Sequence, residues 1–134
     1  MAKRREAREL AFQIVFEKSF TDSSVEEIIS SAEEIRGVEF DEYAKMVSDG
    51  VYENLELIDG IISKYSVARS IRRLSKVVLA VLRLAVYEIL FVDGLEVSIS
   101  INEAIELTKC YATDEEGGFV NGVLGAFVRT EGLA

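Results

Sequence analysis

The segment from Val77 to Val92 constrains the fold of this chain more than any other. It is apolar at nearly every position, with Arg83 and Glu88 as its charged residues. It is too short and too charged to span a bilayer, because a membrane-crossing helix needs about 20 predominantly apolar residues. A helix that is apolar on all sides is normally buried among other elements. We therefore expect a central helix over residues 75–92, surrounded by the rest of the chain.

The other long segments have the spacing of amphipathic helices. Their apolar residues recur every three or four positions, and the chain contains no proline to interrupt them. One of these helices begins at a capping box, either Ser23 with Glu26 or Ser24 with Glu27, and ends near Gly37. The expected helices cover residues 5–16, 24–37, 41–65, 75–92, a stretch that begins at 100, and 118–129.

The predicted fold class is all-α, a compact bundle of about six or seven helices in a single domain over residues 1–134. Gly50 lies inside a helical segment and weakens it by about 1 kcal/mol relative to alanine, which indicates close packing against a neighbouring helix. Residues 96–100 alternate like a strand, but they are too few to form a sheet alone. Ser100 and Glu103 have the spacing of a second capping box, at the start of the next helix.

Residue types that perform chemistry are scarce. The chain contains no histidine, Walker loop, nucleophile elbow or dinucleotide fingerprint. The single cysteine, Cys110, has no histidine to activate it, so we expect a buried, inert thiol. The acidic cluster of Asp114, Glu115 and Glu116 could hold a hard metal ion, but a solvated loop is the preferred interpretation. We therefore expect no enzyme activity, no catalytic residues, no metal site and no cofactor.

The net charge of −9 is unevenly distributed. The stretch between Gly60 and Tyr87 has no acidic residue, and the first eight residues carry Glu6 alone against four basic side chains. The basic residues between Gly60 and Tyr87 are Lys64, Arg69, Arg72, Arg73, Lys76 and Arg83. Two basic patches on an acidic body are typical of a protein that binds an anion at selected places. The single cysteine and the charged N-terminus favour the reducing cytoplasm.

Four segments of the chain form a specific series. They are Lys3–Ala11 (KRREARELA), Val81–Leu90 (VLRLAVYEIL), Ser100–Lys109 (SINEAIELTK) and Phe119–Leu124 (FVNGVL). In this order and spacing they resemble the NusB family of bacterial transcription antitermination factors. The similarity covers nearly the whole chain.

The resemblance implies a helical protein that pairs with NusE, a small ribosomal protein. The pair would bind the single-stranded boxA element of nascent RNA and support ribosomal RNA transcription, acting on RNA polymerase together with other Nus factors. Relatives of this fold can also self-associate, which makes a homodimer an open alternative. A contrasting hypothesis is a helical protein–protein adaptor that does not itself bind RNA, and the overall negative charge favours it. A third hypothesis, a subunit of an RNA-modifying enzyme, rests on shared fold alone.

The resemblance also implies roles for individual residues. The arginine-rich RNA-binding stretch of the family falls on Lys3, Arg4, Arg5 and Arg8, where guanidinium groups near a helix N-terminus suit phosphate oxygens. The alternative to an RNA-binding role is that these residues form a solvated, frayed terminus. The other expected RNA contacts are Tyr65, Arg69, Arg72, Phe119 and Asn121. The expected contacts with the protein partner are Phe16, Val78 and Glu115.

Several of these assignments have alternatives. Tyr65 and Phe119 could be core residues, because an aromatic side chain at helical spacing is more often packed inside. The stretch 69–76 could be a solvated loop and first helical turn. The chain also departs from the family pattern, with Val78 in place of an acidic partner contact and Gly118 in place of a basic residue.

Overall fold

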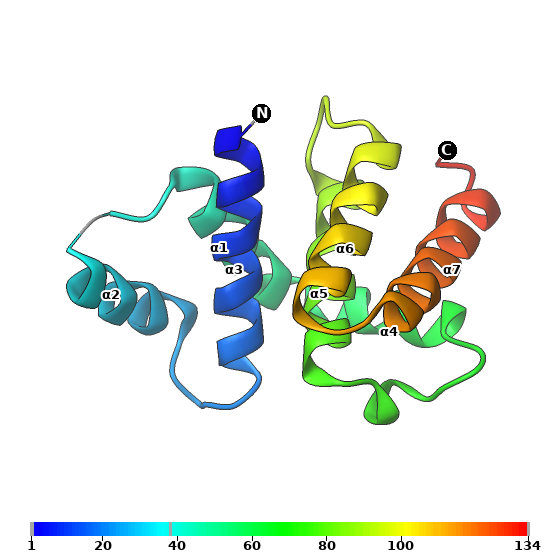
Figure 1. The fold of residues 1–134 in the computed structure, drawn as a ribbon, viewed down its shortest axis with the longest axis horizontal. Coiled ribbons are helices and arrows are strands. Elements are labelled where there is room, and N and C mark those ends of the chain that lie inside the picture. The colour runs from blue at the N-terminus through cyan, green and yellow to red at the C-terminus, as the bar shows by residue number, and fades with distance from the viewer. Residues whose placement is uncertain (1, 38, 134) are drawn as a thin grey trace.

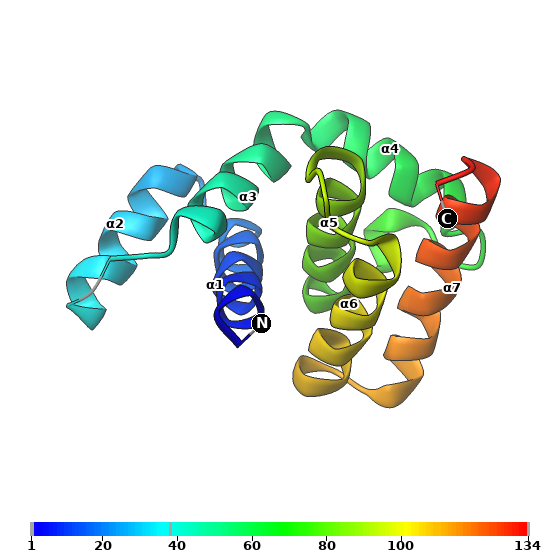
Figure 2. The same cartoon turned by 90° about the horizontal axis from the view of Figure 1, so that it is seen from above.

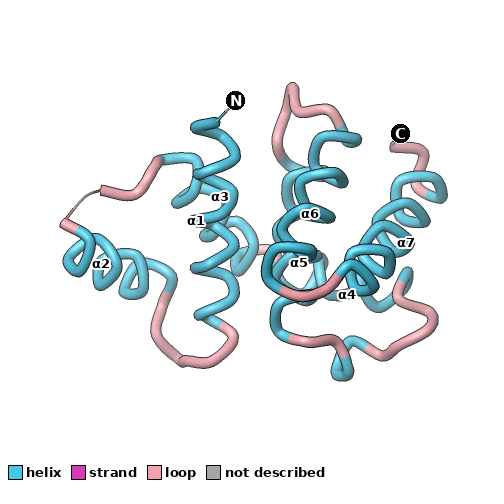
Figure 3. The backbone as a smooth tube through the Cα atoms, viewed as in Figure 1, coloured by secondary structure: helices cyan, strands magenta, loops and turns pink. Residues whose placement is uncertain are grey.

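The computed structural model of the protein describes residues 2–37 and 39–133, with side chains from Arg4 onward. The described residues form helices and loops and contain no strand (Figure 3), which confirms the all-α prediction. The elements in chain order are α1 (Ala2–Lys18), α2 (Val25–Arg36), α3 (Glu42–Glu53), α4 (Leu55–Tyr65), a short 3₁₀ helix η1 (Ile71–Arg73), α5 (Lys76–Phe91), α6 (Val97–Tyr111) and α7 (Asp114–Thr130).

Helix α5 is the centre of the molecule, as its sequence predicts. It packs against α1, α3, α4, α6 and α7, and the views in Figures 1 and 2 place it between α1 on one side and α6 with α7 on the other. Val78, Leu82 and Leu84 are among its fully buried side chains. Each such side chain contributes roughly 1.5–3 kcal/mol through burial. The apolar sides of α5 therefore join α1 and α3 on one side to α6 and α7 on the other.

Gly50 marks the close approach of α3 to α5. A Cβ atom at this position would overlap the ring of Tyr87. Glycine is the residue that lets the two helices come this near, because it has no side chain. The prediction of close helix packing at Gly50 is confirmed.

The cap of α2 resolves an alternative that the sequence leaves open, and the segment 41–65 corrects a prediction. Ser24 rather than Ser23 caps α2, since its Oγ accepts a hydrogen bond from the Glu27 amide at 3.1 Å and Glu27 Oε1 accepts one from the Ser24 amide at 2.8 Å. The segment 41–65 is two helices rather than one. Asn54 divides it, and its side-chain Nδ2 donates to the Gly50 carbonyl at 2.9 Å.

The starts of α6 and α7 correct two predictions. Helix α6 begins at Val97, so Ser100 lies inside the helix, buried, and does not cap it with Glu103. Helix α7 begins at Asp114 rather than at residue 118, because the Thr113 Oγ1 accepts a hydrogen bond from the Glu116 amide at 3.0 Å. The acidic cluster 114–116 is therefore the first turn of a helix and not a loop. The helix dipole stabilises negative side chains at this end.

Three further features bear on the chemistry and location expected of the chain. Cys110 is exposed, which overturns the expectation of a buried thiol. No group of His, Cys, Asp and Glu side chains is arranged to hold a metal ion within the described part of the chain. None of its helices combines the length and the apolar character that crossing a membrane requires.

Candidate nucleic-acid interface

Arg8 lies in the interior and pairs with Glu88, the acidic residue of the central helix. The Arg8 Nε donates to the two carboxylate oxygens of Glu88 at 2.8 and 3.1 Å. The Arg8 side chain is 5% exposed and that of Glu88 is 2% exposed. A side chain this enclosed cannot reach an RNA phosphate. The prediction of an RNA contact at Arg8 is wrong, and its charge instead compensates a buried carboxylate.

Tyr43 completes this buried cluster from α3. Its hydroxyl donates a hydrogen bond to Glu88 Oε2. Burial raises the pKa of the Glu88 carboxyl, while the hydrogen bonds from Tyr43 and Arg8 oppose that rise. Burial also raises the pKa of Tyr43, and the adjacent Glu88 carboxylate adds to the rise. The cluster explains why a glutamate stands inside an apolar helix.

Arg5 is held on the surface by Glu103 of α6. Its Nε and Nη2 donate to the two oxygens of Glu103 at 2.9 and 2.7 Å, a bidentate ion pair. This pair holds the pKa of Glu103 below its usual value. The side chain of Arg5 is 70% exposed and that of Glu103 is 14% exposed. Arg5 is therefore accessible to a phosphate, but its Nε and Nη2 already have an acceptor.

Arg4 differs from both of these arginines. Its guanidinium carbon lies 3.8 Å from the centroid of the Tyr43 ring, and the side chain is exposed. Among the described residues no carboxylate forms an ion pair with Arg4. Since Tyr43 is anchored through Glu88, it presents a fixed aromatic face to this guanidinium. Arg4 is thus the described arginine of α1 whose donors remain available, whereas the side chain of Lys3 lies outside the described residues. The sequence did not single out Tyr43.

A second group of expected RNA contacts forms around the start of α7. The Arg69 Nη1 donates to Glu116 Oε1 at 2.9 Å, and its guanidinium carbon lies 4.3 Å from the centroid of the Phe119 ring. Phe119 is half-buried, and Asn121 is exposed on the same helix. The structure therefore brings Arg69 and Phe119 together.

The residues around η1 supply the accessible positive charge of this second group. Arg72, Arg73 and Lys76 are exposed, and none of them forms an ion pair with a described residue. The Lys76 Nζ lies 5.9 Å from the ring centroid of Phe20, at the end of α1. The second half of the connection between α4 and α5 is therefore cationic on its exposed side.

Tyr65 stands apart from Arg69 and Phe119. Its hydroxyl donates to Glu131, just beyond α7, and its ring centroid lies 5.8 Å from that of Phe127. Tyr65 is half-buried. It faces the last turn of α7, whereas Phe119 lies near the first.

The two groups of arginines lie at opposite ends of the bundle. In Figure 1, α1 and α6 both begin at the top of the molecule, whereas the start of α7 and the loop after α4 lie toward the bottom. Glu103 stands in the second turn of α6, and Glu116 in the first turn of α7. An RNA that contacts both groups must run along the α6–α7 hairpin.

The expected partner contacts have different outcomes. Val78 is fully buried in α5 and cannot touch a partner, so that prediction is wrong. Phe16 is half-buried and packs between Phe12, which it stacks on, and Phe20, which it meets edge to face, with ring centroids 5.9 and 5.0 Å away. Phe20 is 63% exposed and extends this aromatic row to the surface, a feature that the sequence did not single out. Glu115 is exposed. The partner roles of Phe16 and Glu115 stay predictions.

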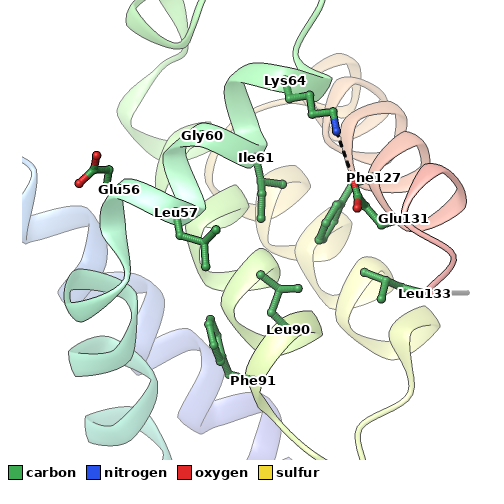
Figure 4. Close-up of a pocket in the computed structure, with 10 residues that line it drawn as sticks. All are labelled: Glu56, Leu57, Gly60, Ile61, Lys64, Leu90, Phe91, Phe127, Glu131 and Leu133. Atoms are coloured by element: carbon green, nitrogen blue, oxygen red, sulfur yellow. Dashed lines mark hydrogen bonds and ion pairs between the residues drawn. The ribbon is translucent and has the colours of Figure 1, made fainter.

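An apolar hollow lies away from the arginines, between α4 and the ends of α5 and α7 (Figure 4). It has a volume of about 700 Å³. Leu57, Leu90 and Phe91 face into it, and the Lys64–Glu131 ion pair stands at its edge. Apolar residues at helical spacing look like core residues in a sequence, so the hollow had no sequence signal.

Comparison with known proteins matches the NusB family over residues 5–129. The chain is 42% identical over 123 residues to the transcription antitermination protein NusB of Ruminiclostridium cellulolyticum, covering 90% of this chain and 85% of that protein. It is 42% identical over 122 residues to NusB of Bacillus licheniformis, covering 91% and 93%.

Solved structures agree with these sequence matches. A chain from a crystal structure of the antitermination factors NusB and NusE in complex with double-stranded RNA superimposes with a TM-score of 0.86 at 32% identity, covering 97% of this chain and 98% of that one. T. maritima NusB superimposes with a TM-score of 0.81 at 38% identity, covering 94% and 90%. The chain is therefore a non-enzymatic member of the NusB family of transcription antitermination factors.

Proposed function

We propose that this protein, together with NusE, binds boxA-type RNA in nascent transcripts and supports ribosomal RNA transcription in the cytoplasm. The observation that carries the proposal is the end-to-end similarity to a chain crystallised with NusE and double-stranded RNA. Its role toward RNA polymerase and the other Nus factors is indirect. The protein positions RNA and a protein partner relative to each other and catalyses nothing.

The RNA-binding surface has two cationic parts. Arg4, with Lys3 beside it in sequence, forms the first at the start of α1. Arg72 and the exposed cations that follow it form the second around η1. Lysine and arginine side chains neutralise phosphates and release counterions, which drives association without base specificity.

Bases are recognised by the aromatic and amide groups beside these cations. Unpaired bases stack on aromatic rings, and the half-buried rings of Phe119 and Tyr65 lie beside Arg69 and Lys64. The exposed amide of Asn121 adds a donor and an acceptor on the same helix. Backbone contacts thus supply affinity, and these groups supply selectivity.

NusE docks on the aromatic row at the end of α1. Phe20 is exposed there and Phe16 packs beneath it, while Lys76 links this surface to the cationic loop. Interface cores are enriched in such aromatic side chains. Glu115 contributes at the polar rim. A homodimer would use the same surface and would therefore compete with NusE.

The test is fluorescence anisotropy of a short labelled boxA-like single strand, with and without NusE, across a salt series. We expect binding that strengthens when NusE is added, with log K falling against log salt by about 0.7 per phosphate neutralised. A hairpin of the same composition measures the preference for single strands. A salt slope near zero would contradict the electrostatic mechanism.

The adaptor hypothesis is the second candidate, and one observation favours it. Arg5, Arg8 and Arg69 all have carboxylate partners within the protein, so a large share of the expected RNA-binding charge is already compensated. Under this hypothesis NusE is captured, but RNA does not bind at any salt concentration. The same experiment separates the two functions.

A further inference from the structure

Two arginines expected to contact RNA are bound by carboxylates of the α6–α7 hairpin. Arg5 pairs with Glu103 of α6, and Arg69 pairs with Glu116 of α7. The arginines come from separate parts of the chain, 98 and 47 residues away from their partners. One hairpin thus supplies an anion to each of the two cationic groups.

Arg5 binds Glu103 with the same pair of donors that an arginine uses to bind a phosphate. A guanidinium fork binds carboxylate and phosphate alike, through two parallel N–H donors. Glu103 accepts from both the Nε and the Nη2 of Arg5, at 2.9 and 2.7 Å. An RNA phosphate must therefore displace Glu103 before it can take the Nε–Nη2 fork of Arg5.

The Arg5–Glu103 pair can open at a small cost in free energy, because the arginine that moves is already largely in solvent. Arg5 is 70% exposed and can swing toward solvent, whereas Glu103 is 14% exposed and stays against the body of the protein. When Arg5 leaves, Glu103 keeps a second positive neighbour, since Arg8 Nη1 lies 3.9 Å from its Oε1. The carboxylate is therefore not left as an uncompensated charge. Exposed ion pairs are weak in any case.

Arg69 is also held by a glutamate, but through one nitrogen, since its Nη1 donates to both Oε1 and Oε2 of Glu116 at 2.9 and 3.1 Å. The side chain of Arg69 is 33% exposed and that of Glu116 is 22% exposed. The Phe119 ring lies 4.3 Å from the guanidinium carbon of Arg69. Each cationic group thus combines a competing carboxylate with a nearby aromatic ring.

We propose that Glu103 and Glu116 are internal competitors of RNA phosphate, which hold Arg5 and Arg69 until RNA displaces them. This inference rests on the proposed RNA-binding function. The competition lowers affinity for any polyanion and leaves selection to an RNA that also makes the stacking and partner contacts. The two carboxylates are specificity-determining residues that act against binding.

The test measures RNA affinity and its salt dependence for Glu103→Gln. The matched control is Glu106→Gln, which removes the same charge one turn along α6 from an exposed side chain that pairs with Lys109 at 3.9 Å. We expect Glu103→Gln to raise affinity by roughly two- to fivefold beyond the control, the strength of an exposed ion pair. Its salt slope steepens by about 0.7, for one more cation available to phosphate.

A double-mutant cycle identifies the arginine. In an Arg5→Gln background the freed donor is absent, so Glu103→Gln should have no more effect than Glu106→Gln. If Glu103→Gln fails to fold by circular dichroism, Glu116→Gln tests the same mechanism independently at Arg69, with Asp114→Asn as the control for lost charge in the first turn of α7.

The outcomes separate the inference from the function on which it depends. Absence of RNA binding by the unmodified protein, with and without NusE, would overturn the proposed function. Binding by the unmodified protein, with equal effects of Glu103→Gln and Glu106→Gln, would overturn the competition alone. A gain from Glu103→Gln that persists in the Arg5→Gln background would also overturn it.

Discussion

Arg5 and Arg8 lie one turn apart on α1, and both form ion pairs with glutamates, yet their surroundings assign them opposite roles. Arg8 and Glu88 are enclosed between α1 and α5, whereas Arg5 and Glu103 meet at the surface between α1 and α6. A buried pair cannot lose one member without leaving a charge in the interior. An exposed pair can exchange its partner for water or for another anion. An arginine–glutamate pair thus stabilises the fold between α1 and α5, whereas the pair between α1 and α6 leaves its arginine available for binding.

The largest effect expected from this contrast is on stability. Replacing Arg8 by alanine leaves Glu88 buried without its counter-ion, so we expect the free energy of unfolding to fall by about 3–5 kcal/mol. Arg5→Ala removes an exposed partner and should lower it by less than about 1 kcal/mol. Urea denaturation of the two variants measures both losses. Equal losses would mean that burial does not distinguish the two pairs.

Removal of the Tyr43 hydroxyl should have an effect of intermediate size on stability, and it tests the buried pair further. Tyr43→Phe removes a donor from the buried Glu88 carboxylate, and we expect a loss of about 1–3 kcal/mol in the free energy of unfolding. Tyr111→Phe is the matched control, because its hydroxyl donates to Glu9 in an exposed pair, and it should lose less than about 1 kcal/mol.

The same variant separates structure from binding. Tyr43→Phe keeps the ring beneath Arg4 and should retain RNA affinity, measured by anisotropy. A variant with full stability but weakened RNA binding would show that the Tyr43 hydroxyl serves RNA rather than the Glu88 cluster.

The smallest expected effect is the pH dependence of the exposed pair. Glu103 has a pKa lowered below its usual 4.5 in the folded protein, chiefly through its hydrogen bond to Arg5. A carboxyl with a lowered folded pKa contributes stability above its unfolded pKa, and this contribution is lost as the pH falls through the folded pKa.

We therefore compare the unmodified protein with Glu103→Gln by urea denaturation at neutral pH and well below pH 4.5. Their difference in unfolding free energy should be below about 1 kcal/mol at neutral pH, because the pair is exposed, and should shrink toward zero in acid. A difference that does not change with pH would assign the stabilisation to packing of the Glu103 side chain rather than to its charge.

Sequence patterns predicted the helices well but placed individual site residues less well. The apolar segment around Leu82 and the glycine at position 50 carry local signals, and both predictions are confirmed. The family resemblance predicts contacts with a partner or RNA at Val78 and Arg8, but both residues are buried. A side chain on a helix can face the core or the solvent according to its neighbours, so a residue type alone does not decide exposure.

What the sequence determined by itself is therefore the local part of the protein. Helical periodicity, the Ser24–Glu27 capping box and the overall charge asymmetry depend on residues close together in the chain, and they can be read without knowing the fold.

Tertiary structure alone decided which charges meet. Arg8 and Glu88 are 80 residues apart and Arg5 and Glu103 are 98 apart, and no local pattern links such pairs. Electrostatic energies depend on distance and on exclusion of water. The packing of α1 against α5 and α6 therefore determines which arginine of one motif supports the core and which remains available to RNA.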